Sequence, residues 1–190
     1  LEVRLTRGSL EFATAVADVR RYFMPVRPVT LAIRAMHVGR YGADAEASQL
    51  ARLYAGHQQF VHGYGFGSFE EGECGVLERE TCNVFDRLTG SRVFVGNIEL
   101  RAPLLGLFRG EIDYGAYVPL EVAVFFDAGV GWSADSKPSV LGGAREVVRS
   151  YGAAVRANIF GFLTLELAAS RAIDRARRPV KWQLGVVQGF

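Results

Sequence analysis

The sequence predicts an all-β fold, and more specifically a transmembrane antiparallel β-barrel. Long segments alternate between apolar and polar residues, which places the two kinds of side chain on opposite faces of a strand. No stretch approaches the roughly 18 uncharged apolar residues of a membrane-spanning helix. A last alternating run, Trp182, Leu184, Val186 and Phe190, closes on an aromatic residue. Barrels cross membranes with alternating strands of this kind, without long apolar runs.

The segment 118–132 is the clearest predicted strand. Its even positions are all apolar, whereas its odd positions include Glu121, Asp127 and Gly129. Its length exceeds the usual soluble strand of about 5–6 residues and suits a tilted transmembrane strand with extensions. We therefore expect the even positions to face lipid and the odd positions to face the interior of the barrel.

Seven other segments bring the number of predicted strands to eight. They are 1–7, 10–23, 30–40, 94–104, 150–159, 163–170 and 181–190. The segment 10–23 can also be read as a helix, because alanine is frequent in it. A soluble sandwich would alternate in the same way, so alternation alone does not decide which face of these strands is inside.

The stretch 42–91 lacks sustained alternation and is predicted to be one very long loop. Loops of this length inside a compact domain are uncommon and usually functional. The loop contains Val61, His62, Gly63 and Tyr64, and its glycines allow a tight turn at positive φ.

The two cysteines, Cys74 and Cys82, lie in the same loop. In an oxidising compartment they would form a disulfide that closes a short loop, and the alternative is two free thiols.

Composition argues against several classes of function. The net charge is only +2, and the twenty arginines are scattered, so we expect no nucleic-acid partner. The histidines His37, His57 and His62 show no nucleophile–base or metal-ligand spacing, so we expect no enzyme activity, no metal and no cofactor. The sequence starts at Leu1 with no basic segment followed by an apolar one. We expect that a signal has been removed or that this is the C-terminal piece of a longer chain.

Several motifs in order resemble one family. Val61, Gly63 and Tyr64 match the loop-tip pattern Val/Ile-Arg-Gly-Phe/Tyr, with His62 in place of the arginine. Three further stretches match in sequence order. Residues 97–101 match the pattern Asn-x-Glu-Leu-Arg, and Phe125, Asp127 and Gly129 match Phe-x-Asp-x-Gly. At the end of the chain, Gln183, Gly185 and Phe190 match a C-terminal strand signal. Gln188 departs from that signal, which has a hydrophobic residue there. The chain resembles the BamA/TamA family of outer-membrane assembly factors, also called bacterial surface antigens.

The resemblance implies a location, a fold and a function. The location is the bacterial outer membrane, and the chain would be the C-terminal eight strands of a sixteen-stranded barrel. Its partners would be membrane lipid, client outer-membrane proteins, and absent N-terminal strands and POTRA domains of the same chain. It would insert or translocate other outer-membrane proteins at a seam between its first and last strands. The alternatives are a membrane anchor or passive pore for a separate N-terminal domain, and a soluble all-β binding domain.

The resemblance also implies that the long loop folds into the barrel and is pinned to its inner wall. The wall would consist of Glu99, Phe125 and Asp127, with Gly129 on the same face, and His62 would meet it. Histidine titrates near neutrality, whereas arginine is always charged. We therefore expect either a weaker, pH-dependent attachment or another arginine in the missing role.

Overall fold

Eight long antiparallel strands form one sheet in the computed structural model, which describes residues 1–6, 8–65, 67–69, 83–104, 120–143, 145–159, 163–175 and 179–187. Their order in the sheet is β1-β2-β3-β6-β7-β8-β9-β10, so neighbours along the chain are neighbours in space. The strands are β1 (Glu2–Thr6), β2 (Phe12–Val26), β3 (Val29–Tyr41), β6 (Arg92–Pro103), β7 (Leu120–Trp132), β8 (Val148–Ile159), β9 (Leu163–Ala172) and β10 (Val180–Val187). The predicted all-β fold is confirmed, and the ambiguous segment 10–23 is a strand.

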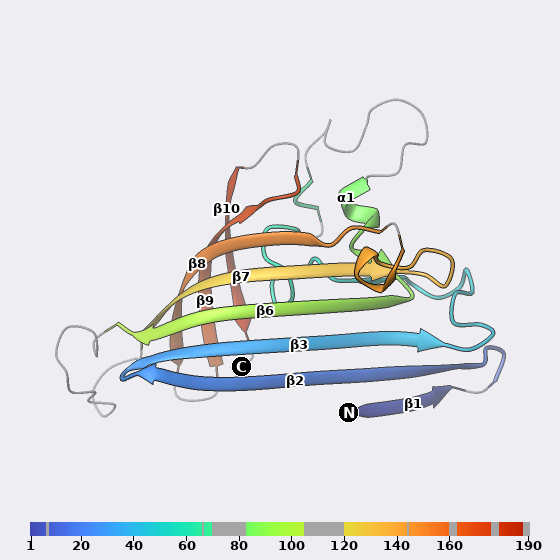
Figure 1. The fold of residues 1–190 in the computed structure, drawn as a ribbon, viewed down its shortest axis with the longest axis horizontal. Coiled ribbons are helices and arrows are strands. Elements are labelled where there is room, and N and C mark those ends of the chain that lie inside the picture. The colour runs from blue at the N-terminus through green and yellow to red at the C-terminus, as the bar shows by residue number, and fades with distance from the viewer. Residues whose placement is uncertain are drawn as a thin grey trace.

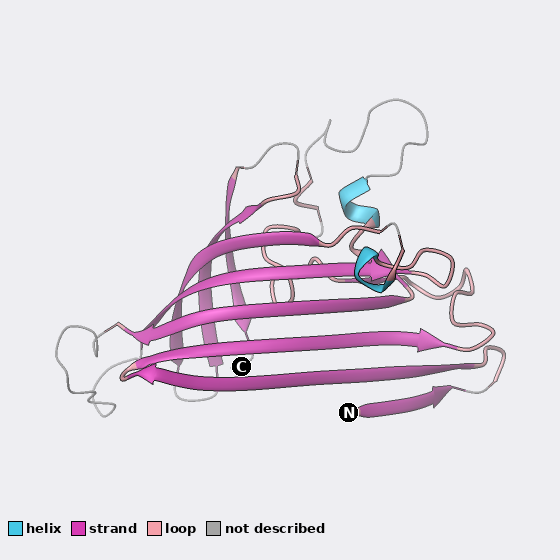
Figure 2. Cartoon of the chain, viewed as in Figure 1, coloured by secondary structure: helices cyan, strands magenta, loops and turns pink. Residues whose placement is uncertain are grey.

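The remaining described elements are short and lie in the connections. They are β4 (Leu53–Tyr54), α1 (Asn83–Asp86), β5 (Thr89–Gly90) and the 3₁₀ turn η1 (Ser139–Leu141). Figure 2 shows how little helix accompanies the strands. No helix among the described residues is long and apolar enough to cross a membrane.

The sheet is strongly curved but open. β2, β3, β6 and β7 run side by side across the view, while β9 and β10 rise steeply behind them (Figure 1). Within the described residues, β1 pairs only with β2 and β10 pairs only with β9. One edge of each terminal strand is therefore unpaired in this part of the chain.

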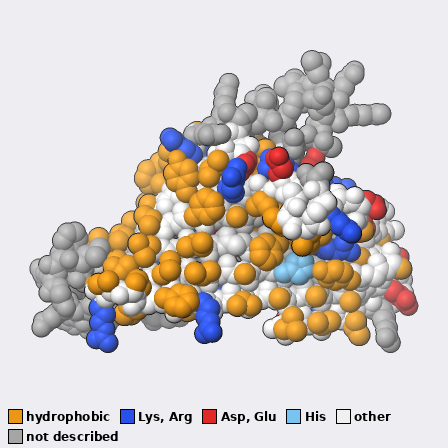
Figure 3. Space-filling view, in the orientation of Figure 1, with side chains coloured by type: hydrophobic (Ala, Val, Ile, Leu, Met, Phe, Trp, Pro, Cys, Tyr) orange, Lys and Arg blue, Asp and Glu red, His pale blue; other side chains and the backbone are white. Residues whose placement is uncertain are grey.

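The convex face carries an apolar surface (Figure 3). Alternate residues along the strands expose large apolar side chains there, among them Ile33, Phe94, Ile98, Leu100, Val124, Phe126, Tyr151, Val155, Leu167, Trp182, Leu184 and Val186. So broad an exposed apolar area is unusual on a soluble monomer and is typical of a membrane-facing surface.

The expectation that every even position of 118–132 faces lipid is wrong at one end of β7. Val124 and Phe126 are exposed on the convex face, but Val130 and Trp132 are buried. The Trp132 ring stacks on His37 of β3, with 5.4 Å between ring centroids. Protein contacts therefore replace lipid contacts at this end of β7, just before the connection that contains η1.

The concave face carries the long loop between β3 and β6. A buried apolar cluster joins loop residues to inward-facing strand residues: Met36, Ala55, Val61, Tyr64, Leu88, Val93, Val95, Val148 and Ala172. The Gly131 amide donates to the Arg87 carbonyl (2.7 Å), which fixes the returning end of the loop against β7. The loop therefore lies on the inner wall of the curved sheet, held by apolar packing and backbone hydrogen bonds.

Candidate functional site: the loop tip and its wall

The loop tip is a tight turn formed by residues 57–64. The His57 carbonyl accepts hydrogen bonds from the amides of Phe60 (2.8 Å) and Val61 (3.0 Å), which turns the chain back on itself. Gly63 follows at φ +82°, a conformation that residues with a side chain rarely adopt. Its Cα also lies close to β9, because a Cβ there would sit 3.2 Å from the Ser170 hydroxyl. Glycine at this position thus serves both the turn and the close approach.

His62 points into the wall and meets carboxylates on both sides of its ring. Its Nδ1 lies 2.6 Å from Oδ2 of Asp127, and its Nε2 lies 3.2 Å from Oε1 of Glu166. Carboxylate oxygens only accept hydrogen bonds, so both ring nitrogens must donate, and only the charged imidazolium can do that. The ring also stacks on Phe125, with 4.1 Å between centroids. This contact leaves the ring edge and its two N–H groups facing the carboxylates.

The His62 ring belongs to a buried charge cluster formed by His62, Glu99, Arg101, Asp127, Arg156 and Glu166. The three carboxylate side chains are at most 1% exposed. Three cations balance them only when His62 is protonated. Burial by itself lowers the pKa of His62, but hydrogen bonds and charges from Asp127 and Glu166 outweigh it and raise that pKa to about 9. With His62 protonated, the six buried groups carry no net charge, and the more exposed Glu121 contacts Arg156 from the edge of the cluster at 3.5 Å.

Arg156, on β8, supplies the fixed positive charge that the loop tip lacks. Its guanidinium binds Glu99 through two parallel hydrogen bonds of 2.8 and 2.9 Å and Glu166 through a third of 2.7 Å. Such forked pairing is specific to arginine. These bonds join wall residues to one another and do not attach the loop, so the expectation that another arginine takes the missing role stays a prediction.

The arrangement differs from the expected wall in one residue. Glu99 binds Arg156 and Arg101 (2.7 Å), and the second carboxylate at His62 is Glu166 of β9. Glu166 and Arg156 were not among the site residues predicted from the sequence. Their register could have indicated them, since Glu166 lies opposite Arg156 on the polar face of neighbouring strands.

Asp127 connects the loop tip to three strands. Its carboxylate accepts hydrogen bonds from the His62 amide (3.1 Å), from Asn97 of β6 (2.8 Å) and from the Ser150 hydroxyl of β8 (3.3 Å). Asn97 also donates to the carbonyl of Phe60 in the turn (2.6 Å). The carboxylate therefore satisfies loop and wall donors at once, in a completely buried site.

Gly129 makes room for Val61. A Cβ at Gly129 would lie 2.6 Å from Cγ2 of Val61, which is closer than real contacts allow. Val61 itself is completely buried. The glycine predicted on the inner face is thus a packing site for the first residue of the tip.

Tyr64 anchors the far side of the tip. Its hydroxyl donates to the Arg149 carbonyl (2.7 Å) and accepts from the Asp174 amide (3.3 Å), and its carbonyl accepts from the hydroxyl of Tyr54. Arg175, which was not among the predicted site residues, donates to the Gly63 carbonyl (2.9 Å). The tip is therefore held by the connection between β9 and β10 as well as by the strands.

The loop tip also contacts β10. The Gly63 amide donates to Oε1 of Gln183 (3.1 Å), and the Gln59 side chain reaches the Val186 carbonyl at 3.5 Å. A Cβ at Gly185 would lie 2.6 Å from the Gln58 side chain. Two of the three residues predicted as a C-terminal strand signal, Gln183 and Gly185, therefore face the loop.

Three predicted site residues lie outside the described residues. These are Phe190, the last residue of the strand signal, and the two cysteines Cys74 and Cys82. The predicted disulfide therefore stays a prediction.

The curved sheet, its apolar convex face and the loop on its inner wall are typical of part of a membrane β-barrel with an inserted loop. A family model described as the Omp85 superfamily domain matches residues 2–186, and the chain belongs to that superfamily. No curated protein matches the chain. The predicted resemblance to the BamA/TamA type of barrel is thereby confirmed at superfamily level, and with it a barrel of the outer-membrane insertion and secretion family.

Proposed function

We propose that this barrel inserts or translocates other outer-membrane proteins, without chemical catalysis, and that the docked loop holds its last strand in place. The observation that carries the proposal is that one short turn binds both the wall and β10. His62 contacts β7 and β9 through Asp127 and Glu166, while Gly63 contacts Gln183 of β10. A loop that served only to fill the barrel would need no polar contacts to the terminal strand.

More than eight strands are needed to complete such a barrel. A closed eight-stranded barrel has an interior just wide enough for side chains. The concave face here also accommodates backbone of the loop, with Ala55, Val61 and Tyr64 completely buried. We propose that further strands of the same protein complete the barrel, at the total of sixteen that the family resemblance implies.

The terminal strand β10 is suited to a seam that opens. An unpaired strand edge is a template for pairing with another chain, and glycine weakens strand packing. Gly185 lies in the middle of β10, against Gln58 of the loop. We propose that loop contacts stabilise β10 in its closed position and that their release lets a client strand pair at its edge.

A crosslink between the loop and β10 tests the proposal. In the full-length protein with Cys74→Ser and Cys82→Ser, the pair Gln58→Cys and Gly185→Cys is oxidised, and client insertion into proteoliposomes is measured. We expect insertion to fall at least about tenfold and to recover after reduction. The matched control is Val3→Cys with Ala15→Cys, which joins β1 to β2 in register without touching the loop.

Two outcomes would contradict the proposal. If the oxidised Gln58–Gly185 pair inserts clients as well as its reduced form, the loop does not control the strand. If the wild-type protein has no effect on client insertion, the barrel is a passive pore or a membrane anchor for another domain.

A further inference from the structure

At the end of the sheet that carries the long loop, the side chains of the convex face differ from those on the rest of that face. Over most of the face the outward side chains are aliphatic or phenylalanine, but here aromatic residues stand beside arginines. Two such groups occur: Tyr41 with Arg92 on β3 and β6, and Tyr151 with Arg171 on β8 and β9. Neither arginine has an ion pair among the described residues.

A chain of contacts fixes the first group. The guanidinium carbon of Arg92 lies 4.7 Å from the centre of the Tyr41 ring. The Tyr41 hydroxyl lies 2.7 Å from Nε2 of His37, whose Nδ1 lies 2.9 Å from the Val93 carbonyl. A carbonyl only accepts, so Nδ1 carries the proton and Nε2 accepts from the tyrosine when the ring is neutral. The tyrosine is thus held in one orientation, and the arginine lies over its ring.

Arg92 is half-buried. Its Nε is enclosed by protein and has no hydrogen-bond partner in the part of the chain that the structure describes, so only the terminal nitrogens of the guanidinium could bind a headgroup. The carboxylate of Glu46 feels the charge of Arg92, but that carboxylate accepts hydrogen bonds from the Ser91 hydroxyl and the Ala134 amide, both at 2.6 Å. These two donors occupy Oε1 of that carboxylate.

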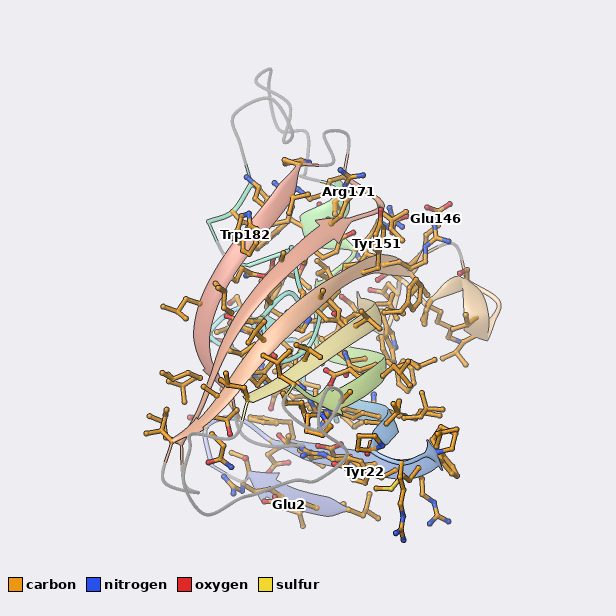
Figure 4. The ribbon with its side chains drawn as sticks, turned by 90° about the vertical axis from the view of Figure 1, so that its left-hand side faces the viewer. Glu2, Tyr22, Glu146, Tyr151, Arg171 and Trp182 are labelled. Atoms are coloured by element: carbon orange, nitrogen blue, oxygen red, sulfur yellow. The ribbon has the colours of Figure 1, made fainter. Side chains whose placement is uncertain are left out.

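The second group lies on the same face, two strands further along the sheet. Tyr151 and Arg171 are partners in the register of β8 and β9, and both are exposed. Figure 4 shows the two side chains near one another, at the end of these strands where the loops begin. The group continues the aromatic and basic rim that Tyr41 and Arg92 begin.

We propose that this rim binds the phosphate groups of lipid headgroups in the leaflet on the loop side, with Arg92 and Arg171 as the phosphate ligands. Aromatic residues of membrane barrels lie at headgroup level, above an apolar band. Arginine pairs with phosphate through a planar fork of donors and also stacks on aromatic rings. The adjoining exposed apolar residues, such as Phe94 and Ile98, offer a surface for the acyl chains of the same lipids.

The proposal rests on a membrane location, which the superfamily supplies, and not on the proposed role in protein insertion. Charge and apolar surface occur together at the rim, which favours a phospholipid-type ligand over a soluble phosphate. A soluble phosphate would need only the arginines.

Lipid titration followed by native mass spectrometry tests the site. The full-length protein in detergent is titrated with bisphosphorylated lipid A and with its dephosphorylated form, and Arg92→Ala and Arg171→Ala are compared with wild type. We expect each variant to bind the phosphorylated lipid at least about fivefold more weakly, and the dephosphorylated lipid to bind wild type no better than it binds the variants. Inorganic phosphate should not compete at concentrations that match the lipid.

Arg21→Ala is the matched control, because Arg21 is an exposed arginine of β2 that lies opposite Ile33 in register. It is about 26 Å from Tyr41 along the strands, at about 3.3 Å per residue. Arg92→Lys keeps the charge without the fork and should bind with intermediate affinity. The proposal is overturned if Arg21→Ala weakens binding as much as Arg92→Ala, if both lipids bind wild type equally, or if inorganic phosphate displaces the lipid.

Discussion

The inner wall carries two carboxylates that pair with cations in very different surroundings. On β2, Asp18 binds Arg20 at 2.8 Å and Arg34 of β3 at 2.9 Å, and its side chain is 25% exposed. On β7, Asp127 binds His62 at 2.6 Å in a site where its side chain is completely buried. The distances are similar. The loop encloses the Asp127 carboxylate, whereas it reaches the Asp18 site only from the side of Arg34, which donates to the Gln59 carbonyl at 3.1 Å.

The difference shows what the loop does to the wall. An exposed ion pair contributes about 0–1 kcal/mol, because water solvates each charge when the partner is lost. A buried pair that loses one partner leaves an uncompensated charge, at a cost of about 3–5 kcal/mol. By covering β7, β8 and β9, the loop turns polar wall residues into a protein interior whose charges must balance.

The largest predicted effect comes from removing the carboxylate that faces His62. Asp127→Ala should destabilise the docked loop by about 3–5 kcal/mol, because His62, its backbone amide and Asn97 all lose their acceptor. Asp18→Ala should cost about 1 kcal/mol or less. Protease sensitivity of the loop and urea unfolding in lipid measure the free-energy cost of each substitution. Equal costs for the two variants would show that the loop does not change the environment of the wall.

The next effect concerns the two faces of the sheet. Val124→Arg should cost roughly 2–4 kcal/mol if it lies at the bilayer midplane, because it puts a charge on the exposed apolar face. Val16→Arg, on the half-buried inner face of β2, should cost less, because the new side chain remains in a polar interior. Folding yield in lipid vesicles distinguishes them, and equal tolerance at both positions would refute the assignment of the faces.

Gly129→Ala should cost about 1–3 kcal/mol, because the added methyl group would meet Val61 at 2.6 Å. Gly96→Ala on the neighbouring strand is the control, since a Cβ there meets nothing within 4 Å. Thermal unfolding measures the stability of both variants. A neutral Gly129→Ala would mean that the loop tip is not packed against β7.

The smallest effect at neutral pH is expected for His62→Arg, which replaces a titrating cation by a permanent one. Loop docking in wild type should be fully stable below pH 6.5, the ordinary pKa of histidine, and should weaken as pH rises through about 9. In His62→Arg the protease sensitivity of the loop should stay constant over the same range. A variant that weakens in parallel with wild type would assign the pH dependence to another group.

Regular alternation made most of the fold predictable, because a strand repeats its pattern every two residues. The sequence could not distinguish apolar positions that face lipid from apolar positions that other parts of the protein cover. Val130 and Trp132 continue the apolar pattern of β7, yet neighbouring protein covers them.

In the site, the motif order indicated that His62 and Asp127 would meet. Glu166 lies opposite Arg156 in the register of β8 and β9, but its contact with His62 depends on where the loop tip lies, which a sequence does not state. Arg175 acts on the loop from a connection without alternation, so no pattern pointed to it.

The protonation state of His62 is the central claim, and nitrogen-15 NMR of labelled histidine measures it directly in the lipid-reconstituted protein. The chain has three histidines, and His62→Gln identifies the signal of interest. We predict that both ring nitrogens of His62 carry a proton at pH 7.5 and that the signal changes to that of a neutral ring only near pH 9. A neutral His62 ring at pH 7.5, with a single protonated nitrogen, would contradict the buried charge balance on which the docked loop depends.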